Sequence, residues 1–269
     1  MKTVSLILAV LLSLVRLTSA QSVDASRADA KSLPTMDFLL QQIVNRAVSQ
    51  EGKNDNLFDM NYQYDRIRTW EYRNNRGELK STKEKSSVEN KSLSIAAKAA
   101  GQSAPGKPAL ITQNESDTDS NPSPTAQKLK EYSVPDLVKR FQFTFVGREM
   151  LNGRPAFVVD FKPASDQLEV KSLADNFINK TAGRIWVDEQ DSAIAQAQLH
   201  LTEQVNVLGG VVGPVRKFTC AFTRLRTPEG YWFVRNMDWH LEGRMVVVNR
   251  IVDYHEQKIN EQRIMATAL

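Results

Sequence analysis

The first amphipathic pattern of the chain lies between residues 35 and 50. Its apolar residues recur three and four positions apart, which is the spacing of one helix face. They are Met36, Leu39, Leu40, Ile43, Val44, Ala47 and Val48. Thr35 precedes this run and can cap the first turn. The pattern therefore predicts one amphipathic helix whose apolar face packs against another part of the fold.

An alternating pattern follows and predicts a long strand over residues 60–72. The side chains that share one face of this strand are Tyr62, Tyr64, Arg66, Arg68, Trp70 and Tyr72. Residues 74–77 read Asn-Asn-Arg-Gly, which is a turn signal. Residues 78–89 are predicted to pair back as a polar strand.

From residue 141 onward the pattern is mostly that of strands. Phe141, Phe143 and Phe145 alternate with polar residues, and Asn152-Gly153 predicts a hairpin turn. Further strands are predicted over residues 156–161, 183–188, 194–207, 215–226, 231–241 and 245–255. Residues 170–179 are predicted to form a short helix or an irregular crossing, residues 242–243 a break, and the last dozen residues a frayed tail.

These elements predict an α+β fold with about eight or nine mostly antiparallel strands joined by hairpins in a meander. The expected architecture is a strongly curved antiparallel sheet, or open β-barrel, covered by one or two helices. Residues 73–131 contain no aromatic residue and are rich in polar residues and proline. We interpret about 91–126 as a flexible polar insertion, either a solvated spacer or a segment that contacts a partner.

Residues 1–20 have the pattern of a secretory signal peptide. Lys2 supplies the positive start, Val4 to Leu14 the apolar core, and small residues precede the expected cleavage after Ala20. The apolar run is too short to span a bilayer as a retained helix. We expect an exported protein whose residues 21–269 form a single domain without a transmembrane segment. An uncleaved N-terminal anchor is the alternative.

The charge and the chemistry-bearing residues exclude several functions. The formal net charge of the chain is +4, and its basic and acidic residues are interleaved, so we expect no nucleic-acid partner. Cys220 is the single cysteine, which rules out an intrachain disulfide and favours a buried apolar role. His200, His240 and His255 lack metal-ligand spacing, and no nucleophile elbow or phosphate loop is present. We expect no catalytic residue, no cofactor, no metal and no enzyme activity. A hydrolase whose acids meet only in space is the alternative.

Large apolar residues fall on both faces of the predicted strands. Trp232 adjoins Phe233, and Trp186 lies between Ile185 and Val187. One helix can hardly cover so much apolar surface, so either a second helix packs there or part of the sheet lines a cavity for an apolar ligand. The candidate lining residues are Tyr64, Trp70, Phe143, Phe157, Trp186, Phe233 and Trp239. Arg66 and Arg68 are polar candidates for the mouth of this cavity.

Two segments resemble a known family. Residues 152–163 read Asn-Gly-Arg-Pro-Ala-Phe-Val-Val-Asp-Phe-Lys-Pro, and residues 183–188 read Gly-Arg-Ile-Trp-Val-Asp. This succession resembles bacterial outer-membrane lipoprotein-sorting proteins, the periplasmic carriers of the LolA/LolB-like group. The resemblance covers roughly residues 141–255, and more weakly 35–50 and 60–72. The chain lacks the arginine-proline-asparagine strand motif of those carriers, so no cavity arginine is implied.

The resemblance implies an unclosed antiparallel barrel, capped by helices, in the periplasm. Its apolar interior would hold the acyl chains of a lipid or lipoprotein, as a carrier in envelope transport does. The alternative is a non-enzymatic cell-envelope module of the same fold, whose interior is packed by its own side chains and which binds a protein partner.

Overall fold

The computed structural model describes residues 33–49, 53–90, 138–164, 170, 172–207, 213–245 and 248–264. The predicted signal peptide at 1–20 and the predicted insertion at 91–126 lie outside these ranges. The elements of the described residues are, in chain order, α2 (Met36–Ser49), α3 (Lys53–Asn61), β1 (Tyr62–Arg73), β2 (Leu79–Glu89), β3 (Phe141–Leu151), β4 (Arg154–Pro163), α7 (Leu173–Ile178), β5 (Thr181–Asp188), β6 (Ile194–Leu201), β7 (Val205–Val207), β8 (Gly213–Arg226), β9 (Trp232–Met245) and β10 (Val248–Arg263).

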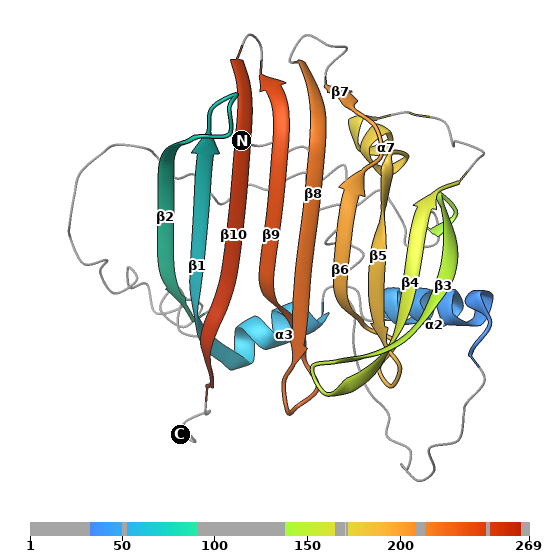
Figure 1. Ribbon diagram of the computed structural model, residues 1–269. Coiled ribbons are helices and arrows are strands. Elements are labelled where there is room, and N and C mark those ends of the chain that lie inside the picture. Colours follow the sequence, from blue (N-terminus) through green and yellow to red (C-terminus); the bar gives the residue numbers. More distant parts are fainter. Residues whose placement is uncertain are drawn as a thin grey trace.

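The strands form one antiparallel sheet of ten, in the order β2-β1-β10-β9-β8-β6-β5-β4-β3, with β7 paired to β8 (Figure 1). From β3 to β10 the chain is the predicted meander, in which consecutive strands pair except that β6 and β7 both pair with β8. The β1–β2 hairpin is added beside β10, the last strand. The order ends at β2 on one side and at β3 on the other, so the sheet is open.

The helices α2 and α3 lie across the lower end of the sheet in Figure 1, and α7 lies at the opposite end. α2 matches its predicted range, and the backbone N–H of Phe38 donates to Thr35 Oγ1 at 3.4 Å, which confirms the predicted cap. α3 was not expected, because its sequence offers little helical apolar periodicity. Its fully buried Phe58 stacks on Phe233 with ring centroids 4.0 Å apart, so tertiary packing stabilises this helix.

The Asn152-Gly153 turn between β3 and β4 confirms the predicted hairpin. Asn152 has a φ of 53° and Gly153 a φ of 77°. Positive φ at both central residues is the geometry of a two-residue turn that matches the twist of the flanking strands. Asparagine and glycine adopt it at low energetic cost, so a local sequence signal was sufficient here.

Three predictions about the strands were wrong. The predicted strand 194–207 is divided into β6 and β7, which both pair with β8. The predicted break at 242–243 is continuous strand, in which Gly243 pairs with Val215 and Arg250. Residues 258–263 of the predicted tail belong to β10, where Arg263 pairs with Tyr62. β1 supplies hydrogen-bonding partners along this polar segment, which its own sequence could not reveal.

The two faces of the sheet differ in character. The core face carries the main hydrophobic cluster, which includes Phe157, Phe222, Trp239 and Tyr254. Of the twenty buried residues that the structure describes in this cluster, seventeen lie on strands. The outer face is the opposite side of the sheet, and it carries small apolar clusters around Trp186 and Trp232. Leu151 packs against both of these small clusters.

Candidate functional site

An aromatic row crosses the core face from β1 to β9. Trp70 pairs with Tyr254, and Tyr254 pairs with Trp239, so the three side chains project from the same side of adjacent strands. The ring centroids of Trp70 and Tyr254 are 5.2 Å apart, and those of Trp239 and Tyr254 are 5.1 Å apart. The strand register extends the row to Cys220 and Leu199. Tyr254, Trp239, Cys220 and Leu199 are buried and Trp70 is half-buried, so the row is a continuous aromatic and apolar part of the main core.

The predicted lining residues fall into three places. Phe157 and Trp239 belong to the main core cluster, and Trp70 and Phe143 are partly buried against it. Tyr64 and Phe233 form a separate cluster with Phe58 at the end covered by α3. Thus the core face brings together Trp70, Phe143, Phe157 and Trp239, while Tyr64 and Phe233 belong to the packing of one helix.

Trp186 lies apart from the other predicted lining residues. Ile185 and Val187 join the main core cluster, and alternation along β5 places Trp186 on the outer face. There it packs with Ala156 and Val158, and its indole N–H donates to Glu149 at 2.8 Å. Trp186 therefore cannot share a core-face cavity with Trp239.

The predicted polar residue Arg66 forms a bidentate ion pair with Glu256 on the core face. Arg66 Nε and Nη2 donate to the two carboxylate oxygens at 2.9 and 2.8 Å. The hydroxyl of Tyr254 also donates to Glu256. Burial by itself raises the pKa of Glu256, but the hydrogen bonds and positive charge of Arg66 outweigh it and hold this pKa below its ordinary value. Arg68, the second predicted polar residue, lies directly opposite Glu256 in the strand register.

Removing the Glu256 carboxylate should make the protein less sensitive to acid. The pKa of Glu256 is lower in the folded state, so its ionised form stabilises the fold above the ordinary value of 4.5. That contribution is lost as the pH falls through the lower folded-state pKa. We expect Glu256→Gln to lower the free energy of unfolding by about 2 kcal/mol at neutral pH, and by much less near pH 3.

Urea unfolding at the two pH values measures this difference. Glu84→Gln, an exposed carboxylate on β2, is the control and should behave like the unaltered protein. An equal loss of stability for Glu256→Gln at both pH values would contradict the prediction.

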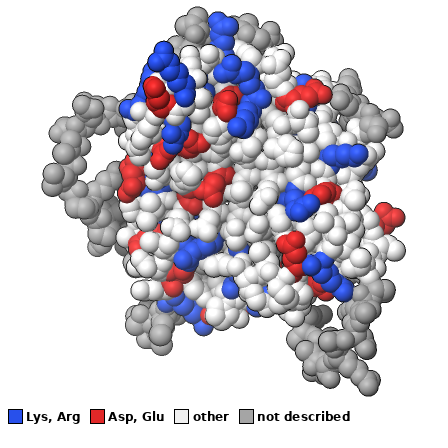
Figure 2. Space-filling model, in the orientation of Figure 1, with Lys and Arg blue, Asp and Glu red and all other residues white. Residues whose placement is uncertain are grey.

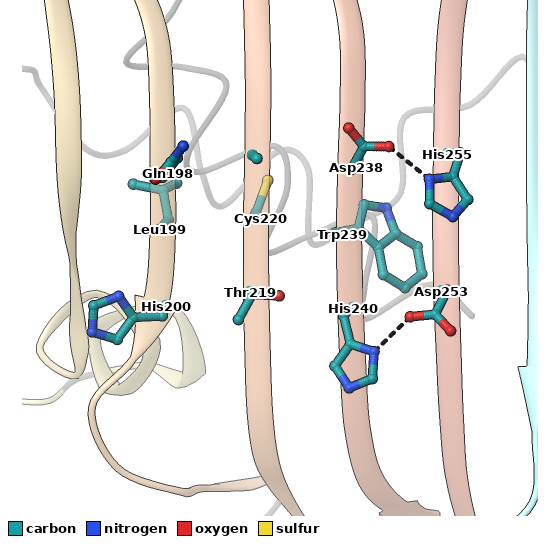
Figure 3. Close-up of a pocket in the computed structure, with 11 residues that line it drawn as sticks. Gln198, Leu199, His200, Thr219, Cys220, Asp238, Trp239, His240, Asp253 and His255 are labelled. Atoms are coloured by element: carbon teal, nitrogen blue, oxygen red, sulfur yellow. Dashed lines mark hydrogen bonds and ion pairs between the residues drawn. The ribbon is translucent and has the colours of Figure 1, made fainter. Parts of the chain in front are cut away.

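A pocket of about 390 Å³ opens on the outer face. Its lining residues are Gln198, Leu199, His200, Thr219, Cys220, Ala221, Asp238, Trp239, His240, Asp253 and His255. All three histidines of the chain therefore meet here, although they lie on β6, β9 and β10 (Figure 3). His200 pairs with Thr219 in the register, and Thr219 pairs with His240, which aligns the polar side chains across the strands.

Two histidine–carboxylate pairs connect β9 and β10 in this pocket. His240 Nδ1 lies 2.5 Å from Asp253 Oδ1, and His255 Nδ1 lies 2.6 Å from Asp238 Oδ1 (Figure 3). His240 Nε2 also lies 2.9 Å from Glu242, and this hydrogen bond holds the pKa of Glu242 below its ordinary value. Among the described residues no group of three side chains is placed to hold a metal ion. The pairs align the two strands and present a polar surface.

The sequence carried a signal for these pairs that was missed. Residues 238–240 read Asp-Trp-His and residues 253–255 read Asp-Tyr-His. In an antiparallel register centred on Trp239 and Tyr254, each aspartate lies opposite the histidine of the other strand. The same alternation places the two aromatic residues on the core face. A search for identical polar patterns on paired strands would have found the motif.

Charged side chains on one face of the molecule do not separate by sign. Figure 2 shows Lys and Arg interspersed with Asp and Glu on the face turned to the viewer. This distribution agrees with the interleaved charges of the sequence. Among the described residues no helix is long and apolar enough to cross a bilayer.

Comparison with known proteins assigns no family. No protein-family model matches the chain, and no curated protein matches it in sequence. A solved outer-membrane lipoprotein-sorting protein domain from Vibrio parahaemolyticus is 13% identical, with 86% of this chain and 93% of that chain covered and a TM-score of 0.31. A DUF1329 family protein from Desulfovibrio piger is 8% identical, with 88% and 96% covered and a TM-score of 0.26. The Pseudomonas aeruginosa MucA/MucB complex matches at 9% identity, with 85% and 100% covered and a TM-score of 0.25. At TM-scores this low, the similarities assign neither family nor function.

Proposed function

We propose that this protein is an exported, non-enzymatic module of the bacterial cell envelope that binds the acyl chain of a lipid or lipoprotein on its core face. The observation that carries the proposal is the extent of this face compared with its described helices. Among the described residues, strands supply seventeen of the twenty buried residues of the main cluster, whereas α2 supplies Leu39 and Ile43 and α7 supplies Phe177. α2 and α3 cross only one end of the sheet (Figure 1).

The aromatic row is the part of the core face best suited to an acyl chain. Trp70, Tyr254 and Trp239 are adjacent on three neighbouring strands, away from the cluster of Phe58 under α3. Each methylene group that leaves water contributes about 0.8 kcal/mol, so ten buried methylenes contribute about 8 kcal/mol before the entropy of association is subtracted. Contact with one row of side chains can therefore provide a useful affinity.

Export and a periplasmic location are part of this proposal. They are supported by the signal-peptide pattern of residues 1–20 and by the resemblance of residues 152–163 and 183–188 to lipoprotein-sorting proteins. Binding of an acyl chain agrees with a location in the envelope, because a protein with an apolar binding face can shield such a chain from water during transport.

Replacing Trp239 should weaken acyl-chain binding about tenfold. Trp239→Leu keeps an apolar side chain but removes most of the flat surface beside Tyr254, and a tenfold change corresponds to about 1.4 kcal/mol. Isothermal titration with palmitate measures the affinity, and native mass spectrometry detects lipid that copurifies with the protein. Trp186→Leu is the matched control, because Trp186 is equally large but lies on the outer face.

The two variants separate binding from folding. Urea unfolding of both shows whether either substitution destabilises the fold, and only Trp239→Leu should alter the affinity for palmitate. If the unaltered protein binds no palmitate and copurifies with no lipid, the proposed function is wrong.

A protein-binding role is the second candidate, and the outer-face pocket favours it. The side chains of His255 and Asp238 are each 55% exposed, so the edge of this pocket is accessible to a partner. Polar pairs held in a fixed geometry suit recognition of another polar surface. Absence of lipid binding would leave this envelope protein-interaction role as the better interpretation.

A further inference from the structure

We infer that the ligand of the core face is an anionic amphiphile whose acid group binds beside Arg68. This inference rests on the proposed acyl-chain binding and adds the chemical class of the head group. The evidence for this head group is a change from apolar to cationic side chains along the core face. One row of paired residues runs from Phe222 through Met237 and Glu256 to Arg68 and Lys85. Its apolar end lies on β8 and β9, and its cationic end on β1 and β2.

The adjacent aromatic row has the same direction. It runs from Cys220 through Trp239, Tyr254 and Trp70 to Lys83 on β2. Two neighbouring rows therefore both lead from apolar side chains to a lysine at the open edge of the sheet. An acyl chain lying along these rows would place its head group next to β1 and β2.

Arg68 has hydrogen-bonding capacity that the described residues leave unused. Its Nε is buried and has no hydrogen-bond partner among the described residues. Glu256 lies opposite Arg68 in the register, but its carboxylate accepts hydrogen bonds from Arg66 and Tyr254. A buried donor without a partner is unfavourable, so an oxyanion that reached Arg68 would gain a charge-assisted hydrogen bond.

The charges around Arg68 favour an anion. Glu256 neutralises Arg66, whereas Arg68, Lys83 and Lys85 form no ion pair among the described residues. Lys83 and Lys85 are exposed on the edge strand β2 and can approach a head group from the solvent side. A carboxylate or a phosphate fits this arrangement, because both accept paired hydrogen bonds from a guanidinium group.

Binding of lipids that differ in head-group charge tests the inference. The probes are palmitate, palmitoyl lysophosphatidylglycerol and the uncharged monopalmitoylglycerol, each below its micelle concentration and at low salt. We expect the full chain to bind at least one of the two anionic probes about tenfold more tightly than the uncharged probe. A preference confined to palmitate identifies a carboxylate site, and one confined to lysophosphatidylglycerol identifies a phosphate site.

Arg68→Gln should remove this preference while the uncharged probe binds as before. Arg68→Lys keeps the charge but loses the forked donor geometry, and should restore part of the preference. Lys217→Gln is the control, because Lys217 is an exposed cation that pairs with Glu242 away from the core face. If Arg68→Gln does not fold, Lys85→Gln is the second variant, with an expected loss of about threefold that disappears at high salt.

These measurements distinguish a failure of the head-group inference from a failure of the proposed function. Equal affinity for all three probes, unchanged by Arg68→Gln or Lys85→Gln, would overturn the head-group inference and leave acyl-chain binding intact. Failure of the unaltered protein to bind any of the three probes would overturn the proposed function itself.

Discussion

Replacing Gly183 with alanine should lower the free energy of unfolding by about 3 kcal/mol or more. Gly183 lies within β5, between Phe161 on β4 and Leu199 on β6. A Cβ atom at this position would lie 2.1 Å from the carbonyl oxygen of Gln198 and 3.1 Å from the Cα of Leu199. Both are backbone atoms that cannot rotate away. β5 and β6 would have to separate, which would break hydrogen bonds within the sheet.

Urea denaturation of the purified variants measures this loss. Gly147→Ala is the matched control, because Gly147 is also a strand glycine but a Cβ atom added to it would meet no other atom within 4 Å. We expect its stability to change little. A Gly183→Ala variant as stable as Gly147→Ala would show that β5 and β6 are farther apart than these distances indicate.

Replacing Asp188 with alanine should destabilise the protein by about 4 kcal/mol. The Asp188 carboxylate is buried and accepts hydrogen bonds from Arg154 Nε and Nη2 at 2.6 and 2.8 Å. It also accepts the backbone N–H groups of Gln190 and Asp191 at 3.1 and 2.7 Å, which holds the turn after β5. Without this carboxylate, two backbone donors lose their partner, and the Arg154 guanidinium keeps a longer contact with Asp191, at 3.4 Å, but loses both close hydrogen bonds.

A second arginine–aspartate ion pair, also between β4 and β5, provides the control for Asp188→Ala. Asp160 on β4 and Arg184 on β5 form an equally close bidentate pair, with distances of 2.6 and 3.0 Å. These side chains are 44% and 39% exposed, so water can replace the lost interaction. Thermal and urea unfolding should show a small effect of Asp160→Ala beside the large effect of Asp188→Ala. Similar effects of the two substitutions would mean that burial does not govern the strength of these pairs.

Local signals predicted the elements that local interactions stabilise. The cap at Thr35, the helix that follows it and the Asn152-Gly153 turn were predicted correctly, because each depends on residues a few positions apart. The alternation of β1 correctly placed Trp70 and Arg66 on one face. α3 and the last residues of β10 were not predicted, because Phe233 and β1 stabilise them from distant positions in the chain.

The candidate site was predictable only in part. Of the predicted lining residues, the core face brings together Trp70, Phe143, Phe157 and Trp239, and this placement depends on strand order. Their role in lining a ligand site stays a prediction. Trp186 was assigned together with Trp239 because both are large and apolar, although strand alternation placed its neighbours Ile185 and Val187 on the core face. The pairing partner of Arg66 could not be inferred, because Glu256 is 190 positions away.

The sequence by itself determined an antiparallel meander with one amphipathic helix and apolar residues on both strand faces, since side-chain periodicity depends only on backbone geometry. Only the tertiary structure placed β1 beside β10. That pairing aligned Trp70 with Tyr254, opposed Arg68 to Glu256 and created the change from apolar to cationic side chains along the core face. Pairing between distant strands is decided by how the whole sheet satisfies its hydrogen bonds and buries its apolar face, which no short segment encodes.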